Sequence, residues 1–436
     1  MKTGTTVRTP RALICLASLF MLATAATGCG PQIFHSGFLA SWSRDGSRVA
    51  LVADPLHEDG NPETRKSGIL IYSTATGKSK QIISTGEGLT CLHAQWSPFS
   101  NDLLFVTVDE QDQEDSQPGK PGSYLIWRVG PDGEGLRQLA TGTYLGEGES
   151  GMTLLRPNAV TWGDQPGTYL LQQRVGEKVT AILFDPHTGG ARQFLPDVAD
   201  GYSLEPSPDR RKVAALLYDA PSGLARLFIS DFGYGNWRLL DTLQCDAKQL
   251  EGLAPMIYWS PDSTRFVIPE TASGNRAGEE DRGHLRLFET GRAGSSRIAE
   301  DRPQSVVQWS RDSRSLVYSA VDPDHDSNLT IYRVDLNSGR KTALISEGKN
   351  NLMAWNSETG RVYFYRTSGK DEASLNELIS CAGDGSDARP EGFSFGGDHP
   401  SWCASSGGSS LVIYREPLAP TLLDITAPIR LVQLQF

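Results

Sequence analysis

The apolar positions of this chain fall into short runs that alternate with polar turn residues. From residue 37 onward, runs rich in Val, Ile, Leu, Tyr and Phe are bounded by clusters of Gly, Pro, Asp and Ser. This is the pattern of β-strands joined by tight turns. No segment shows apolar residues at a sustained helical period. The pattern predicts an all-β fold built from many short strands.

One unit of runs and turns is repeated along the chain. Its clearest copies are ASWSRDGSRVALV from Ala40, AQWSPFSNDLLFV from Ala94, IYWSPDSTRFVI from Ile257 and VQWSRDSRSLVYS from Val307. Weaker copies complete a series of eight anchor positions, which are Trp42, Trp96, Trp162, Pro206, Trp259, Trp309, Trp355 and Trp402. Their mean separation of about 51 residues suits a propeller blade of four strands.

Each unit has a second half that continues the strand pattern. An example is LTIYRVDLNSGRKTALI from Leu329, where two strand-like runs flank a Gly-containing turn, as in a β-hairpin. The first half supplies another hairpin, in which Asp folds back onto the backbone and Gly46 takes a left-handed conformation. Every unit therefore holds four strands. We expect the anchor tryptophans to pack between blades as core residues.

The repeated Trp-Ser-Pro-Asp-Gly-like turn, followed by an apolar strand, resembles the WD-repeat-like propeller units of the TolB family. The resemblance spans residues 37 to 436. It implies a single β-propeller domain over residues 38–436, with eight blades favoured and seven as the alternative. A closed ring is expected because each blade's sheet faces can be covered only by neighbouring blades.

Two properties of similar proteins are not expected here. TolB carries an α/β domain ahead of its propeller, whereas only eight residues separate Cys29 from Phe38, so the partner-binding role of TolB should not carry over. Similar repeats also precede the hydrolase domain of prolyl-oligopeptidase-type peptidases. In this chain the repeats continue through the eighth unit, so we expect no such hydrolase domain.

The first 28 residues have the pattern of an export signal. Three cations precede an apolar run from Ala12 to Ala26, which is too short to span a membrane. The segment Ala26 to Cys29 resembles the bacterial lipobox, which implies a lipid on Cys29 and a short tether over residues 29–37. Ala26 stands where that motif usually has Leu, so an ordinary cut after Ala25, which would release a soluble protein, is the alternative.

The lipid anchor sets the expected location. Two or three acyl chains hold a protein at a membrane in effect permanently. Gly30 after Cys29 resembles lipoproteins that are sent to the outer membrane. We therefore expect an exported, lipid-anchored protein of the cell envelope, with the outer membrane or the periplasmic side favoured.

The charge balance excludes one class of partner. With 41 Lys and Arg against 52 Asp and Glu, the formal net charge is −11. A general phosphate-neutralising surface is therefore absent, and we expect no nucleic-acid partner. The body of the protein should not be drawn to anionic lipid either, so membrane attachment would depend on the anchor.

Four cysteines remain once Cys15 leaves with the signal and Cys29 is lipidated: Cys91, Cys245, Cys381 and Cys403. An exported protein can form disulfides. The wide spacing has no metal-ligand signature. We expect buried thiols, with a bridge between Cys381 and Cys403 as the alternative.

Long charged connections are candidates for binding. Three of them join the expected second and third strands of a unit, from Ala53 to Ser67, from Asp109 to Gly122 and from Glu270 to Gly283. In a four-stranded meander these connections emerge on one side of the disc, where a rigid scaffold presents variable loops. The alternative is that they are solvated insertions without a partner.

Candidate metal ligands are few. His93 and His399 each lie three residues before an anchor Trp and would face the central channel of the propeller, as the metal-binding histidines of pectin-degrading propeller lyases do. Asp322, Asp324 and Asp326 alternate like the start of a calcium loop, but the Gly and Glu that such a loop needs are missing. Both sets are weak candidates, and we expect no cofactor.

Two classes of function remain. The first is a non-enzymatic lipoprotein whose propeller is a scaffold that binds a protein or a component of the cell wall. The second is an enzyme, either a metal-dependent polysaccharide lyase or a hydrolase, with its site in the propeller channel. The weak metal candidates favour the first class.

Overall fold

The computed structural model describes most of the chain from Ala40 to Gln433. The described residues are 40–53, 68–84, 89–109, 121–145, 160–175, 178–197, 199–231, 235–244, 257–270, 284–301, 307–322, 325–356, 359–368, 375–396, 401–404, 410–415, 418–424 and 430–433. The expected signal peptide, Cys29 and the tether lie outside this part.

The described strands form consecutive groups of four, each an antiparallel meander. Groups 1 to 4 are β1 (Ala40–Trp42), β2 (Arg48–Ala53), β3 (Gly68–Ser73) and β4 (Lys78–Ser84); β5 (Leu89–Trp96), β6 (Leu103–Asp109), β7 (Pro121–Val129) and β8 (Arg137–Leu145); β9 (Val160–Trp162), β10 (Tyr169–Val175), β11 (Lys178–Asp185) and β12 (Gly190–Gln193); and β13 (Gly201–Pro206), β14 (Lys212–Asp219), β15 (Leu224–Asp231) and β16 (Arg238–Gln244).

Groups 5 to 8 follow the same order. They are β17 (Tyr258–Trp259), β18 (Arg265–Glu270), β19 (His284–Glu289) and β20 (Ser295–Ala299); β21 (Gln308–Trp309), β22 (Ser315–Asp322), β23 (His325–Asp335) and β24 (Lys341–Ile345); β25 (Lys349–Trp355), β26 (Arg361–Ser368), β27 (Leu375–Ala382) and β28 (Arg389–Gly396); and β29 (Ser401–Ala404), β30 (Ser410–Arg415), β31 (Leu418–Asp424) and β32 (Arg430–Gln433). A 3-10 turn at Ala220–Ser222 joins β14 to β15.

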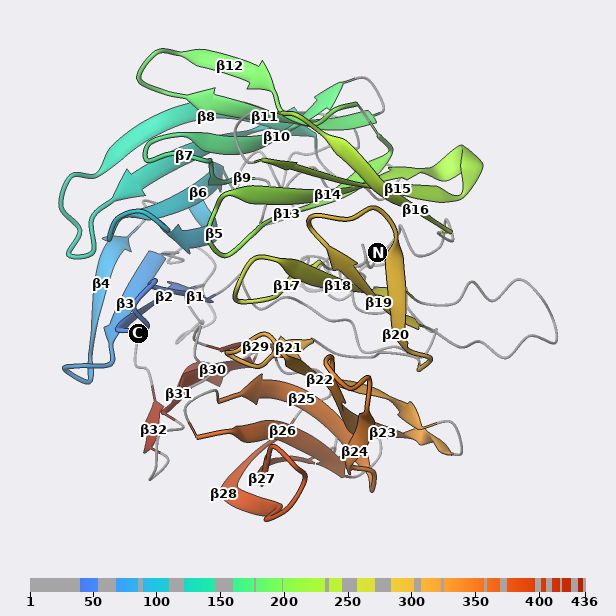
Figure 1. Cartoon of the computed structure of the whole chain (residues 1–436). Helices are drawn as coiled ribbons and strands as arrows, with labels where there is room; N and C mark the ends of the chain where they lie inside the picture. Colours follow the sequence, from blue (N-terminus) through green and yellow to red (C-terminus); the bar gives the residue numbers. More distant parts are fainter. Residues whose placement is uncertain are drawn as a thin grey trace, which may run out of the picture.

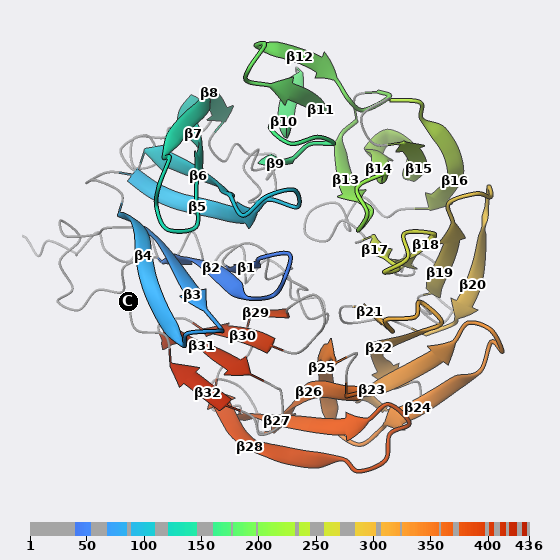
Figure 2. The ribbon, with the colours of Figure 1, turned by 60° about the vertical axis from the view of Figure 1, so that its left-hand side comes forward.

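The groups follow one another around a ring (Figures 1 and 2). The first strand of each group lies nearest the centre and the fourth lies on the outside (Figure 2). This confirms the all-β propeller predicted from the repeats. The number of blades stays a prediction: pairing divides the described strands into seven sheets, because a parallel contact between β23 and β25 joins groups 6 and 7.

The hydrophobic core is divided among the interfaces between neighbouring groups. Six clusters of buried side chains fill the six successive interfaces from groups 1 and 2 to groups 6 and 7. Between groups 4 and 5, for example, Leu216 and Leu227 pack with Phe266 and Phe288. Each sheet therefore covers its apolar faces with its neighbours, and a single group could not bury them alone.

The anchor tryptophans lie in these interfaces. Trp96, Trp162 and Trp355 are buried, and Trp259 and Trp309 are half-buried against the same clusters. The interface role predicted for these five side chains is confirmed.

Three of the anchors also donate a hydrogen bond across the interface. The indole Nε1 of Trp162 donates to the carbonyl of Gln95 at 3.2 Å, that of Trp259 to Glu205 at 2.9 Å, and that of Trp309 to Tyr258 at 3.1 Å. In each pair the acceptor is the residue before the anchor of the preceding group. This bond holds the first strand of one group against the first strand of the preceding group.

The turn after each anchor is held by its serine and aspartate. In group 1 the Ser43 hydroxyl donates to Asp45 at 2.7 Å and accepts from the amide of Arg48 at 2.9 Å. Hydrogen bonds from Ser43 and from Ser47 lower the pKa of Asp45 to about 2. Gly46 has a φ of 69°, so its predicted left-handed conformation is confirmed.

In two groups a serine takes that left-handed position. Ser263 and Ser313 have φ values of 60° and 58°, and both are buried. The Ser263 hydroxyl accepts the amide of Asp209 at 3.1 Å, and the Ser313 hydroxyl accepts that of Asp262 at 3.2 Å. The strained backbone is thus associated with a further bond to the preceding group.

The outer ends of neighbouring groups also meet closely. The turn between β27 and β28 packs on β24, and a Cβ added to Gly385, which has a φ of +87°, would lie 2.7 Å from the carbonyl oxygen of Leu344. The equivalent Gly133 faces Ile82 less closely, since an added Cβ would lie 3.4 Å from its carbonyl oxygen. The seam between groups 6 and 7 therefore depends on glycine at residue 385.

The first and last groups meet through packing. β1 contacts β29, and within the described strands groups 1 and 8 are each built from one continuous segment without an exchanged strand. The described contacts thus close the ring side to side.

Two of the four cysteines are described by their side chains. Cys91 and Cys381 are buried and lie outside any disulfide, which confirms the expectation of buried thiols for these two and argues against a bridge from Cys381. Burial raises the pKa of the Cys381 thiol to about 11. Cys245 and the side chain of Cys403 lie outside the described residues.

No helix in the described segments is long and apolar enough to cross a membrane.

The interface role of Trp162 gives a graded prediction. Trp162→Ala removes a side chain that is 1% exposed and should lower the free energy of unfolding by about 3–5 kcal/mol. Trp162→Phe keeps most of the packing, loses the bond to Gln95 and should cost about 1–2 kcal/mol. Urea unfolding of the wild type and both variants measures these losses in the free energy of unfolding. Losses near zero in both variants would contradict the interface role of Trp162.

The outer seam predicts a difference between two glycines. Gly385→Ala and Gly339→Ala both place Ala at a positive φ, but a Cβ at Gly339 meets nothing within 4 Å. Both variants should be destabilised by the backbone strain, and Gly385→Ala should lose more because Leu344 must also move. The melting temperatures of the two variants measure this difference. An equal decrease in both would contradict close packing of the Gly385 turn against Leu344.

Candidate functional site

The ring presents two faces. In every group the connection from the second to the third strand emerges on one face, which we call the loop face, together with the connection from one group to the next. The turns from first to second and from third to fourth strand lie on the opposite face, which we call the turn face. This division follows from the meander order of the strands.

The three candidate binding loops start and end on the loop face. They join β2 to β3, β6 to β7 and β18 to β19, which are second-to-third connections as expected. The first two belong to neighbouring groups. Asp109 closes β6 and Pro121 opens β7, so the strands extend slightly further than expected. Residues 54–67, 110–120 and 271–283 lie outside the described part.

The inner edge of the ring carries a set of mostly polar residues at one repeated position. It is the residue before the anchor on the innermost strand, and in groups 1 to 6 it is Ser41, Gln95, Thr161, Glu205, Tyr258 and Gln308. One hydrogen bond joins two members of this set: the Thr161 hydroxyl donates to the Gln95 side chain at 2.8 Å. A second bond runs from the amide of the anchor Trp96 to the Ser41 hydroxyl at 3.1 Å.

Glu205 is the acidic member of this set. Its side chain is exposed to solvent, yet surrounding protein limits its hydration, and this desolvation raises the pKa of its carboxyl group to about 7. The positive charge of Arg210, in the adjoining turn, opposes the shift. Glu205 in turn raises the pKa of the buried Tyr258 phenol, which desolvation has already raised. The inner edge therefore holds a carboxyl group that changes charge near neutral pH.

Sequence reasoning did not single out Glu205. The available signal was the irregular fourth repeat, which reads LEPSPDRRKVAAL and has Pro206 where the other anchors are tryptophan. A carboxylate directly before that position interrupts an otherwise neutral series. Its elevated pKa depends on the surrounding groups and has no sequence signature.

The candidate metal ligands are only partly placed. His93 belongs to β5, Asp322 ends β22 and Asp326 lies in β23, but their side chains are not among the described ones. His399 and Asp324 lie outside the described residues. Asp322 pairs with His325 in the hairpin between β22 and β23. Among the described side chains, no group of three or more His, Cys, Asp and Glu is suited to hold a metal ion.

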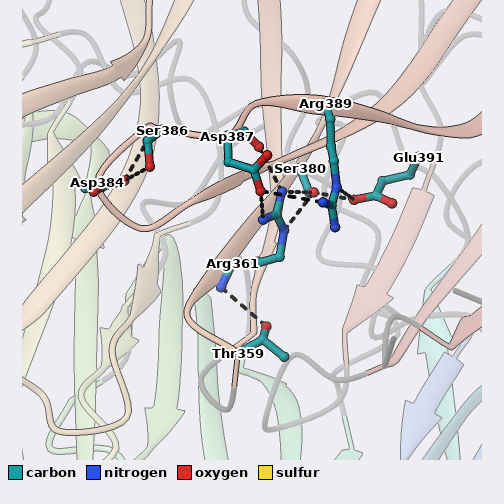
Figure 3. Close-up of polar contacts among 8 residues, drawn as sticks. All are labelled: Thr359, Arg361, Ser380, Asp384, Ser386, Asp387, Arg389 and Glu391. Carbon is teal, nitrogen blue, oxygen red and sulfur yellow. Dashed lines mark hydrogen bonds and ion pairs between the residues drawn. The ribbon is translucent and has the colours of Figure 1, made fainter. Parts of the chain in front are cut away.

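The densest ionic network described lies in group 7 (Figure 3). Arg361 contacts the Asp387 carboxylate at 2.7 Å, and its guanidinium donates to the Ser380 hydroxyl at 2.7 and 3.0 Å. Arg389 lies 3.6 Å from Asp387 and 3.8 Å from Glu391. The Arg361 hydrogen bond lowers the pKa of Asp387. Since these charges pair with one another, the network ties β26, β27 and β28 together and offers no open ligand position.

Comparison with known proteins yields likeness in structure only. No protein-family model matches the chain, and no curated protein matches it. TolB from Acinetobacter baumannii is 11% identical with a TM-score of 0.34, over 81% of this chain and 80% of that one. The β-propeller domain of the Trilobed protease from Pyrococcus furiosus is 13% identical with a TM-score of 0.46, over 84% and 97%.

A putative TolB from Agrobacterium tumefaciens is 15% identical with a TM-score of 0.34, over 64% of this chain and 92% of that one. The chain is thus similar to TolB-like propellers in fold. The propeller assignment rests on the order of the strands and on the ring that they form.

The raised pKa of Glu205 predicts a pH-dependent contribution to stability. Its folded pKa lies above the ordinary value, so the folded state binds the proton more tightly, and stability is lost as the pH rises from about 4.5 to about 7. Glu205→Gln should therefore match the wild type in melting temperature near pH 4 and exceed it near pH 8. A lower melting temperature of the variant at pH 8 would show that the carboxylate is stabilising instead.

Proposed function

We propose that this protein is an exported, non-enzymatic lipoprotein, anchored through Cys29, whose propeller binds a partner at the cell envelope through its loop face. The observation that carries the proposal is topological. The strand ends that flank three long connections lie on one face of the ring, and two of these connections belong to neighbouring groups. Loops held in this way are common binding elements.

The composition of these loops indicates the kind of partner. Residues 53–67, 109–122 and 270–283 together contain thirteen Asp and Glu against five Lys and Arg. They account for −8 of the net charge of −11. Complementary charge favours encounter with a basic surface. The proposed partner is therefore a protein or cell-wall component with a basic binding region.

The position where β1 begins limits how far the loop face can lie from a lipid on Cys29. β1 begins at Ala40 on the loop face, because the first strand of each group runs from the loop face to the turn face. Cys29 lies eleven residues earlier, and eleven extended residues reach about 40 Å at most. A lipid on Cys29 would keep the start of β1, and the loop face with it, within about 40 Å of the membrane, so the proposed partner is at the same membrane.

The second candidate is an enzyme with its site at the inner edge of the ring, either a metal-dependent polysaccharide lyase or a hydrolase. Glu205 is the observation in its favour, since a carboxyl group with a pKa of about 7 is suited to general acid–base work. Metal analysis of the purified protein tests the metal-dependent form. Stoichiometric divalent metal that is lost from a His93→Ala variant would support it over the scaffold.

The scaffold proposal predicts that partner capture depends on the acidic loops. Crosslinked envelopes should yield a captured partner with the wild type and lose it with Glu110→Lys/Asp112→Lys. The matched control is Asp132→Lys/Glu289→Lys, which makes the same charge change at exposed positions of the turn face. Equal capture by both double variants would contradict the loop face as the binding surface.

Lipidation at Cys29 can be tested in the same experiment. Cys29→Ser should move the protein from the membrane fraction to the soluble fraction and reduce capture of a membrane-bound partner. Unchanged fractionation would refute lipidation at Cys29.

A further inference from the structure

The turn after the fourth anchor holds an arginine in a backbone conformation that other turns give to small residues. Arg210 has a φ of 58°. The equivalent residues, four positions after the anchors of groups 1, 5 and 6, are Gly46, Ser263 and Ser313. A left-handed conformation is unfavourable for a residue with a long side chain. Contacts of the Arg210 side chain should therefore offset the strain.

The protein contacts of Arg210 do so poorly. The hydroxyls of Ser263 and Ser313 each accept an amide of the preceding group, at 3.1 and 3.2 Å. The Arg210 guanidinium instead donates one long hydrogen bond of 3.5 Å to the carbonyl of Trp162, which is longer than an ordinary bond of this kind. A guanidinium has five N–H donors, and no other described group accepts one from Arg210. Most of its hydrogen-bonding capacity is thus free.

The bond to Trp162 places the guanidinium at the inner edge of the ring. The Gly163 amide donates to the Thr168 carbonyl, so the next pair along the ladder, Trp162 and Tyr169, is one whose members do not bond to each other. The Trp162 carbonyl therefore points away from β10, toward the open edge of β9, which is the innermost strand of its group (Figure 2). Arg210 reaches this edge from the neighbouring group.

The Glu205 carboxyl group acts on this guanidinium. Desolvation raises the pKa of Glu205 and lowers that of Arg210, and the attraction between the two opposes both shifts. Tyr258 of the next group is the other titratable group that Glu205 affects. Within the described part of the chain Glu205 and Arg210 form no ion pair, and the bond that Glu205 accepts from Trp259 goes to its backbone carbonyl. Both side chains thus keep free hydrogen-bonding positions.

We propose that this inner edge binds a small carboxylate-bearing molecule, with the Arg210 guanidinium as the anion-binding group and the protonated Glu205 carboxyl group as a second donor. A guanidinium matches a carboxylate with two parallel hydrogen bonds, and a protonated carboxyl group donates one more. Glu205 is exposed and Arg210 is half-buried, so both keep contact with solvent. The site lies where β13 ends and β14 begins, at the turn face, and is separate from the loop face.

Glu205 makes the binding sensitive to pH. Its ionised carboxylate would repel the ligand and could no longer donate a hydrogen bond. Because the pKa of Glu205 is about 7, the affinity should be high near pH 6 and should fall as the pH rises through 7.

Three single variants of the purified protein test the proposal. Arg210→Ser removes the guanidinium and introduces the residue type that takes the same conformation at Ser263 and Ser313. Arg211→Ser is the matched control, since it makes the same charge change at the next residue, whose side chain is 86% exposed. Glu205→Gln keeps a neutral donor that does not ionise. The probes are acetate, its neutral analogue acetamide and inorganic phosphate, observed by nuclear magnetic resonance of the ligand.

We expect the wild type to bind acetate near pH 6, and to bind it about tenfold more weakly or worse near pH 8.5. Acetamide should bind about tenfold more weakly than acetate. Arg210→Ser should lose acetate binding without a loss in melting temperature, and Arg211→Ser should bind as the wild type does. Glu205→Gln should bind acetate equally at both pH values.

Three results would overturn the proposal: no acetate binding by the wild type near pH 6, equal weakening in the two arginine variants, or tighter binding of phosphate than of acetate. Equal affinity of the wild type at both pH values would overturn the role of Glu205. The loop variant Glu110→Lys/Asp112→Lys should keep acetate binding, so failure of the scaffold proposal is seen separately.

Discussion

The structure depends on the coverage of each sheet by its neighbours. A four-stranded meander has two faces, and here both are apolar enough to require burial. The six described interfaces meet this need with continuous clusters of buried side chains. Three anchor tryptophans, Trp162, Trp259 and Trp309, also donate to the carbonyl of the residue before the preceding anchor. Because the packing repeats at every described interface, each group positions the next, and the ring follows from a local rule.

The same rule explains how much the sequence could predict. The Trp-Ser-x-Asp turn is a local feature, so the strands, the hairpins, the left-handed Gly46 and the interface role of Trp162 could all be read from it. The number of strands in a group and the face that carries each connection followed from the same pattern. The buried Ser263 and Ser313 could not be anticipated, since their conformation depends on an amide of the preceding group.

The candidate site was less accessible to sequence reasoning. Glu205 owes its raised pKa to the protein that surrounds it, and no motif marks that environment.

The closed ring is the central claim, and distances between its groups test it most directly. Spin labels can be placed at three exposed positions, Ser79 in group 1, Ser296 in group 5 and Ala388 in group 7, in a background without reactive cysteines. Pulsed electron paramagnetic resonance would then compare two pairs. The ring predicts that group 1 lies nearer to group 7 than to group 5, although group 7 is further along the chain. A longer distance to group 7 than to group 5 would indicate an open stack and contradict the account.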